Sequence, residues 1–196
     1  LSAEAGSHRF LWDMHYTPLD QPPSYPMTAV YKNTPPATSS PWVMPGVYTV
    51  KLTVDGQSWT QTFTVKMDPR VKTPLAGLQQ QHDMSLLCYE GRIQCTEILK
   101  DIKAYRSKLQ SSLTNASADV AKKLSPLEKE AAALENAQRG SNEPSFGRLS
   151  GSFAGLFGLL QESDTAPASQ VIQTFNELKK QFDDLKKKWA ELKSKQ

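Results

Sequence analysis

The strongest constraint on this fold is a regular row of apolar residues near the end of the chain. Large apolar side chains recur there at alternating intervals of four and three residues: Val171, Phe175, Leu178, Phe182, Leu185, Trp189 and Leu192. This spacing keeps one face of an α-helix apolar and is typical of helices that pack lengthwise against partner helices. The row, called the seam below, predicts a long helix over residues 168–193 whose apolar face is buried in a helical bundle.

Three further stretches have the helical period. The longest, over 75–113, carries one stripe made of Met84, Cys88, Gly91, Cys95, Ile98, Ile102, Tyr105 and Leu109. A second runs through Val120, Leu124, Leu127, Ala131 and Leu134 and is expected to end at Arg139 and Gly140, and a third covers 146–160. The connections are short, which favours antiparallel neighbours. At helical rise the 75–113 helix is about 58 Å long and the last helix about 39 Å. We therefore expect the long helix to dock its first turns on a sheet domain, or to bend near Gly91.

The first 70 residues differ from the rest in composition and in pattern. Nine of the 13 prolines lie there, and the apolar residues change from the helical period to the alternation of a β-strand. One alternating stretch consists of Phe10, Trp12, Met14 and Tyr16. Prolines between Tyr16 and Pro45 exclude a central strand, so we expect a surface loop there, with one short edge strand at 29–31.

The clearest strand signal lies between Val47 and Lys66. Apolar and polar residues alternate on both sides of Asp55 and Gly56, a pair that suits a two-residue hairpin turn. The apolar set is Tyr48, Val50, Leu52, Val54, Trp59, Phe63 and Val65. These signals predict a small Ig-like antiparallel β-sandwich. Because such a sandwich usually has about seven strands, either the sheet is small or further strands precede Leu1.

The expected architecture is therefore α+β. Residues 1–70 are predicted to form the Ig-like β domain with its proline-rich loop, and residues 71–196 a bundle of about four antiparallel helices. The chain begins with Leu1 and lacks the charged start and apolar core of a signal peptide. We therefore expect a processed chain or a piece of a longer one.

Candidate chemistry is sparse, with two cysteines and three histidines. Cys88 and Cys95 lie seven residues apart on one helix, about 10.5 Å at helical rise, which is too far for a disulfide. We interpret them as small buried apolar residues. Asp13 and His15, with His8 nearby, have donor chemistry for a metal but lack a further ligand cluster, and we interpret them as surface residues of a strand. His82, among glutamines at a helix start, is expected to be solvated.

A row of glycines lies in the 146–160 stretch: Gly147, Gly151, Gly155 and Gly158. Small residues at this spacing permit close helix approach, as in membrane helices, but the stretch is too short to span a bilayer and contains Arg148. We expect close packing within the bundle. No phosphate-binding glycine loop, nucleophile elbow or zinc-protease motif occurs in the sequence. We predict no catalytic, cofactor-binding or metal-binding residue in this chain.

The composition excludes some partner classes. The net charge is +3, from 23 basic and 20 acidic residues, which is too mild to indicate nucleic-acid binding. No apolar run reaches the roughly 18 residues of a membrane span. We expect neither nucleic acid nor a membrane span.

The order of three motifs resembles a known family. The strand Phe10–Tyr16, the hairpin that opens with Met44, Pro45, Gly46 and the exit Asp68, Pro69, Arg70 follow one another and lead into a helical tail. This resembles the C-terminal region of large bacterial proteins with BNR/Asp-box β-propellers, which are related to sortilin-type and sialidase-like propellers and are often labelled glycosyl hydrolases. His15 stands where that family often has Arg. The resemblance implies upstream propellers and an exported protein, periplasmic or extracellular.

Three functional hypotheses follow from these patterns. The first is a non-catalytic accessory or structural module that braces upstream propellers of the same chain or binds a partner, either another protein or a carbohydrate. The second is part of a glycoside hydrolase whose catalytic residues lie mainly upstream. The acidic residues here fall mostly on solvent faces of helices, whereas a glycosidase needs two carboxylates across a cleft, so the first is favoured. The third is a coiled-coil-like oligomerisation unit that uses the last helix.

Overall fold

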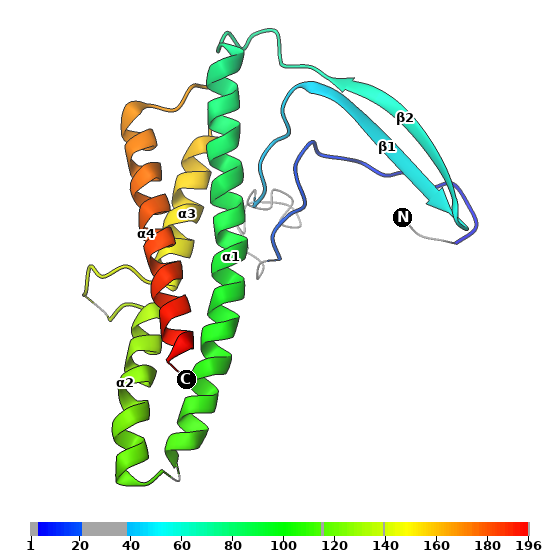
Figure 1. The fold of residues 1–196 in the computed structure, drawn as a ribbon. Helices are drawn as coiled ribbons and strands as arrows, with labels where there is room; N and C mark the ends of the chain where they lie inside the picture. The colour runs from blue at the N-terminus through cyan, green and yellow to red at the C-terminus, as the bar shows by residue number, and fades with distance from the viewer. Residues whose placement is uncertain (1–3, 21–38, 115, 139, 196) are drawn as a thin grey trace, which may run out of the picture. The chain divides into compact units, whose positions relative to one another are not determined.

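The computed structural model describes residues 4–20, 39–114, 116–138 and 140–195. They contain two strands and four helices (Figure 1): β1 (Gly46–Val54), β2 (Gln57–Val65), α1 (Leu75–Thr114), α2 (Ala118–Glu135), α3 (Phe146–Gln161) and α4 (Ser169–Ser194). The protein is therefore α+β, with a two-stranded antiparallel sheet followed by helices. The edge strand expected at 29–31 lies outside the described residues.

The chain divides into two compact units. One consists of Leu1–His82 with Asp164–Ala166, and the other of Asp83–Ser163 with Pro167–Gln196. The first two turns of α1 thus belong to the same unit as the hairpin, and α1 continues unbroken through Gly91. That residues 72–196 fold without the sheet stays a prediction.

The helices of the second unit pack as three columns. Figure 1 shows α2 and α3 following one another along α1 in the opposite direction, while α4 runs back in the direction of α1. The sequence predicts α1, α3 and α4 to within about two residues, but α2 ends at Glu135 rather than at Arg139 and Gly140. Val120, expected on the α2 stripe, is exposed and lies in the first turn of α2.

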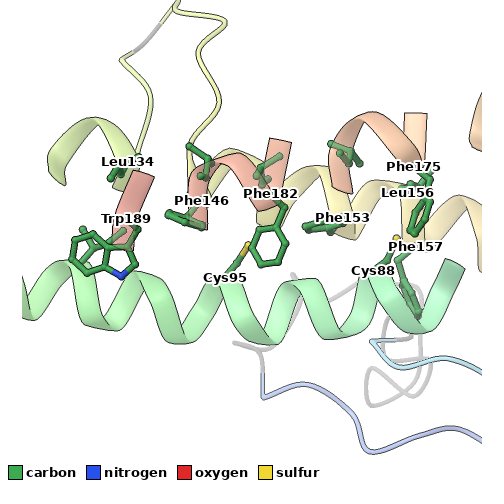
Figure 2. Packing of buried hydrophobic residues seen from close by; sticks show 14 of the residues in the cluster. Cys88, Cys95, Leu134, Phe146, Phe153, Leu156, Phe157, Phe175, Phe182 and Trp189 are labelled. Atoms are coloured by element: carbon green, nitrogen blue, oxygen red, sulfur yellow. The ribbon is translucent and has the colours of Figure 1, made fainter. Parts of the chain in front are cut away.

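The seam of α4 forms the centre of the core. Six of its seven residues are buried, and the seventh, Val171, packs against the same cluster. Phe182 lies edge-on to Phe146 and Phe153 of α3, with ring centroids 6.2 and 5.6 Å away. Trp189 meets Tyr105 of α1 in the same manner at 5.4 Å. Figure 2 shows the rings of Phe146, Phe153, Phe182 and Trp189 between the helices. The predicted burial of the seam is confirmed.

Both cysteines are unlinked and buried on α1, as the spacing predicts. Figure 2 places each Sγ among the aromatic rings of the core. Burial raises the pKa of each thiol to about 12, although Arg92 near Cys88 and Lys186 near Cys95 oppose the shift. At neutral pH both side chains are therefore protonated, and they contribute as small apolar groups.

These thiols should react slowly with a disulfide reagent while the protein is folded, because the thiolate is the nucleophile. Both thiols should react rapidly with the reagent once the protein is unfolded in denaturant. A thiol whose pKa is raised on folding stabilises the fold below its ordinary pKa, and this contribution is lost as pH rises toward 12. Stability should therefore fall above about pH 9. Rapid reaction of either thiol in the folded protein would contradict its burial.

The glycines of α3 do not share one role. A Cβ on Gly147 would meet the side chain of Asn136, but Gly151, Gly155 and Gly158 have nothing within 4 Å of that position. The prediction that all four permit close helix approach is therefore wrong for three of them, which lie on the exposed side of α3. The close approach is at Gly91 of α1, where a Cβ would lie 2.9 Å from the ring of Phe153.

Alanine at these glycines should consequently have opposite effects. Glycine in an exposed helix interior costs about 0.5–1 kcal/mol relative to alanine, so Gly151→Ala, Gly155→Ala and Gly158→Ala together should stabilise the protein by about 1.5–3 kcal/mol. Gly91→Ala should destabilise it by about 1–3 kcal/mol through overpacking. Urea unfolding of both variants is the measurement. If both variants change the free energy of unfolding in the same direction, Gly91 is not packed as described.

A partly buried ionic cluster joins α1 to α2. Arg106 Nε and Nη2 donate to Glu128 Oε1 at 3.0 and 2.7 Å, and Nη1 donates to Glu135 Oε2 at 2.5 Å. Gln110 donates a further bond to Glu128. Hydrogen bonds from Arg106 lower the pKa of Glu128, while burial opposes them. The cluster thus orients α2 against the C-terminal part of α1.

The hairpin forms as the sequence predicts. Asp55 and Gly56 both have positive φ, 50° and 81°, which is the geometry of the favoured two-residue turn. The register pairs Tyr48 with Phe63, Val50 with Gln61 and Leu52 with Trp59. Paired residues share a face, so the apolar side chains gather on one side and the threonines on the other.

The strand predicted over 10–16 is absent. The described part of this segment makes only one isolated bridge, between His15 and Trp42. The amide of His15 donates to Asp13 Oδ1 at 3.1 Å, and Met14 has φ 62°. An aspartate that bonds the backbone two residues ahead favours a turn over a strand. The third strand of the expected sandwich is therefore replaced by a bent segment, and an Ig-like sandwich is not formed by the described residues.

Candidate docking surface on the hairpin

The apolar face of the hairpin is largely open to solvent. The apolar side chains in the half of the hairpin nearer the Asp55–Gly56 turn are about half exposed: Val50 50%, Leu52 46%, Val54 48% and Trp59 54%. A sheet usually buries its apolar face against another layer. Among the described residues no second layer covers this part of the hairpin, and we call these four residues the open apolar face.

The other end of the same face is covered by Trp12. Its ring lies 5.5 Å from that of Tyr48 and 5.8 Å from that of Phe63, measured between centroids. The Tyr48 hydroxyl donates to the carbonyl of Met44 at 2.6 Å, and burial raises the pKa of this phenol, with a smaller contribution from Tyr16. The segment around Trp12 therefore acts as a partial second layer.

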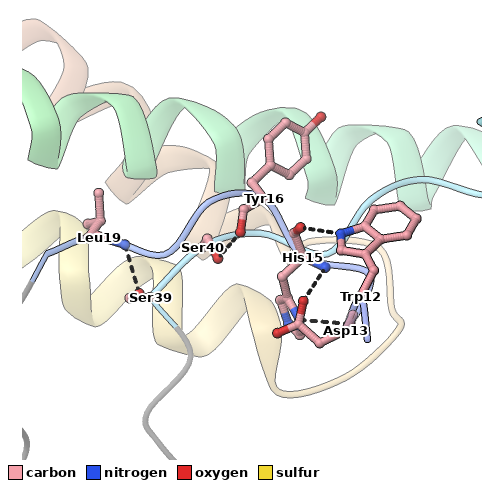
Figure 3. A network of polar contacts seen from close by, with 7 residues as sticks. All are labelled: Trp12, Asp13, His15, Tyr16, Leu19, Ser39 and Ser40. Carbon is pink, nitrogen blue, oxygen red and sulfur yellow. Dashed lines mark hydrogen bonds and ion pairs between the residues drawn. The ribbon is translucent and has the colours of Figure 1, made fainter. Parts of the chain in front are cut away.

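Polar contacts fix the position of that segment. Figure 3 shows the indole N–H of Trp12 donating to the His15 carbonyl, at 2.9 Å, and the Ser40 hydroxyl donating to the Tyr16 carbonyl, at 2.7 Å. Backbone bonds from Tyr16 to Pro41 and from Val43 to Met14 continue the pairing. The His15 ring stacks on Trp42 with centroids 3.7 Å apart. Residues 12–16 are thus tied to the stretch that leads into β1.

An open groove of about 800 Å³ lies between this segment and the hairpin. Its apolar lining comprises Phe10, Trp12, Met14, Tyr48, Val50, Phe63 and Val65. Thr49, Lys51, Thr64 and Lys66 also border the groove, but the strand register places the side chains of Thr49, Lys51 and Thr64 on the opposite face of the hairpin. Phe10 is 69% exposed. The groove is therefore mainly aromatic and aliphatic, and it continues into the open apolar face at Val50.

The residues considered as metal ligands do not assemble a site. His15 Nδ1 lies 3.5 Å from Asp13 Oδ2, and His8 Nε2 lies 2.7 Å from the carbonyl of Glu4. Within residues 4–20, 39–114, 116–138 and 140–195, no group of three or more His, Cys, Asp or Glu side chains is placed to hold a metal ion. Asp13 serves the turn at Met14 instead.

His82 is less solvated than the sequence suggests. Its Nε2 lies 3.3 Å from the Tyr16 hydroxyl, and the two rings are 5.8 Å apart. This contact joins the first turns of α1 to the N-terminal segment within the first unit. It could not be foreseen, because 66 residues separate the partners.

The helical unit has a smaller depression of about 110 Å³, lined by Gly91, the ring of Phe153 and seam residues of α4. Lys179 and Lys186 at its margin are balanced by Glu90 and Asp183. Its charge therefore favours no particular ligand. No helix in the described ranges is both long enough and apolar enough to cross a membrane.

Comparison of the chain with protein-family models, with curated proteins and with solved structures gives no significant match.

Proposed function

We propose that this chain is a non-catalytic accessory module of a larger polypeptide, in which β-strands from outside these residues cover the open apolar face of the hairpin. The observation that carries the proposal is the half-exposed row Val50, Leu52, Val54 and Trp59 on one side of a two-stranded sheet. A lone two-stranded hairpin is at best marginally stable in water, and a third strand or a covering layer is what usually stabilises it.

The energetics favour such a cover. Full burial of one large apolar side chain stabilises a fold by about 1.5–3 kcal/mol. Because these four side chains are half buried already, covering them would add about 1 kcal/mol each. A total of roughly 4 kcal/mol is a large part of the 5–15 kcal/mol that keeps a typical domain folded.

The finer architecture proposed for the complete domain is an Ig-like sandwich. The amphipathic hairpin supplies one of its edges, and the segment around Trp12 begins its second layer. The resemblance to the C-terminal region of BNR/Asp-box propeller proteins suggests where the missing strands originate, namely upstream in the same exported chain. The helical unit, whose core is built from its own four helices, would then brace the propellers.

An association experiment tests this proposal. The 196-residue chain is produced separately from the polypeptide that precedes Leu1 in the full gene product, and the two are mixed and analysed by size-exclusion chromatography. We expect a complex that is lost in the variant Val50→Thr, Leu52→Thr, Trp59→Thr. The control variant Thr49→Ser, Thr60→Ser, Thr62→Ser changes the opposite face and should still bind.

Two results would contradict the proposal. One is the absence of any complex with the unaltered chain, and the other is equal binding by both variants. Glycosidase assays of the same complex on aryl glycosides address the alternative of a glycoside hydrolase. Activity that is lost on substitution of a single carboxylate of the 196-residue chain would favour that alternative.

A further inference from the structure

We infer that the outer edge of β2 is the attachment site for a further β-strand, and that this strand belongs to the polypeptide that the proposed function places before Leu1. The inference rests on the proposed function and adds the edge at which the sheet is extended. Three observations carry it: the backbone groups that the hairpin leaves unpaired, the different composition of its two edges, and the open apolar face beside them.

Each strand of the hairpin has one edge without a neighbouring strand. The two-residue turn makes Val54 and Gln57 a hydrogen-bonded pair, and such pairs alternate with non-hydrogen-bonded pairs along an antiparallel ladder. Residues of the non-hydrogen-bonded pairs direct their N–H and C=O groups outward. On β2 these residues are Ser58, Thr60, Thr62 and Thr64, and on β1 they are Val47, Thr49, Lys51 and Thr53.

The outward backbone groups of β2 are available for pairing. In the described part of the chain no backbone hydrogen bond joins any of them to another segment. The carbonyl of Thr62 accepts a bond from the Gln61 side chain, but at 3.3 Å this bond is longer than usual. From Ser58 to Thr64 the edge is about 20 Å long at the rise of a strand. Such a row of N–H and C=O groups is complementary to the backbone of another extended chain.

The two edges differ in their protection against pairing. Natural sheets guard an exposed edge with charged residues, prolines or bulges. β1 has a charged residue in the middle of its outward set, Lys51. β2 has no charged residue, proline or glycine over Gln57–Val65, and it pairs with β1 without a bulge. Its threonine and aromatic residues favour extended structure. An uncharged strand of this kind readily pairs with another strand when its edge is exposed.

The open apolar face indicates the source of the added strand. Two copies of this chain joined through their β2 edges would leave both open apolar faces half exposed, because edge pairing extends a sheet without covering its faces. A polypeptide that supplies strands for the second layer can supply one for this edge as well. Alternate residues of the added strand would lie beside Trp59 and Phe63, so we expect those residues to be apolar.

Amide exchange resolved by NMR tests the inference at single residues. The isotope-labelled 196-residue chain is measured alone and in complex with the preceding polypeptide. We expect the outward amides of β2 to gain about tenfold protection or more in the complex, because they become bonded to the added strand. The outward amides of β1 stay bonded to water, and their protection should change by less than about twofold.

Proline at matched positions of the two edges provides a second test. Thr62 and Thr49 face each other in the register, and neither amide takes part in the hairpin ladder. Proline is tolerated at such positions, because the amide that it removes faces solvent. Thr62→Pro should weaken the complex by about tenfold or more, whereas Thr49→Pro should leave its affinity within about twofold. Nuclear Overhauser contacts between Tyr48 and Phe63 check that the hairpin forms in both variants, and the exchange experiment on the unaltered chain decides if it does not.

Three results would overturn the inference: protection gained at the β1 edge instead, protection gained at neither edge, or equal binding by two folded proline variants. The proposed function would still hold in these cases if the variant Val50→Thr, Leu52→Thr, Trp59→Thr loses the complex. Conversely, a protected β2 edge in a complex that survives this variant would contradict the proposed function alone. No complex at all would contradict both. A dimer of the isolated chain that Thr62→Pro dissociates would identify a second copy as the occupant and would also overturn the inference.

Discussion

Trp189→Ala should lower the stability of the helical unit by about 3–5 kcal/mol, the usual cost of truncating a buried aromatic residue. Trp189 is 4% exposed, its ring meets that of Tyr105 edge-on, and the ammonium group of Lys193 lies 5.3 Å from its centroid. For a chain of this size the loss corresponds to a fall of about 10 °C in the melting temperature. Thermal unfolding followed by far-ultraviolet circular dichroism measures it.

Two matched variants make this prediction specific. Asp184→Asn, on the exposed side of the same helix, should change the melting temperature little, because surface charges contribute about 0–1 kcal/mol. Trp189→Phe should cost less than Trp189→Ala, since the buried indole N–H has no hydrogen-bond partner among the described residues and its removal leaves no polar group unsatisfied. A Trp189→Ala protein that melts normally would show that the seam is not packed in the core.

Arg106→Ala should also destabilise the protein, with a loss of about 3 kcal/mol. Removing one partner of a buried ion pair typically costs about 3–5 kcal/mol because the other charge stays buried and unpaired. Glu135 is 9% exposed, but Arg106 is 27% exposed, so solvent reduces the effect toward the lower limit. Urea unfolding of the variant gives the free-energy change directly.

The dependence on pH provides a second readout for the same cluster. Arg106 lowers the pKa of Glu128, so the folded state is stabilised above the ordinary carboxyl pKa and loses this contribution as pH falls through the lowered one. In the Arg106→Ala variant, the free energy of unfolding should therefore fall less steeply as the pH is lowered into the acid range. The control Glu130→Gln removes an exposed pair with Lys195 and should change stability by less than about 1 kcal/mol. If both variants behave alike, the α1–α2 cluster is only a surface pair.

The helices could be predicted from the sequence because their signals are local. The 4-3 spacing from Val171 to Leu192 depends only on helical geometry, and the same is true of the Cys88 and Cys95 separation. The Asp55–Gly56 turn is also local, since both residues must adopt positive φ for the strands to pair. Each of these predictions is confirmed by the structure.

The failed predictions depend on competition or on distant partners. The 10–16 stretch alternates as a strand does, but the side chain of Asp13 bonds the amide of His15 and turns the chain at Met14. The glycines of α3 have the spacing of a packing face, yet Gly151, Gly155 and Gly158 are open, and it is Gly91 of α1 that packs closely against the Phe153 ring of α3. Period alone does not say which side of a helix meets a neighbour.

The candidate docking surface was only half predictable. Alternation identifies which side chains share a face of the hairpin, and the predicted faces are those observed. Alternation does not say whether that face is covered, because the cover comes from residues distant in sequence. The groove between Phe10 and Val50 likewise requires the bent path of residues 12–16, which depends on contacts with residues 40–43.

Hydrogen exchange of the hairpin amides tests most directly the claim that this chain carries an incompletely covered sheet. Mass spectrometry would follow residues 46–65 in the 196-residue chain alone and in complex with the upstream polypeptide that the proposed function places before Leu1. The account predicts rapid exchange in the isolated chain, protection that rises at least tenfold in the complex, and unchanged protection of α4. Hairpin amides that are already as protected as those of α4 in the isolated chain, or that gain nothing in the complex, would contradict it.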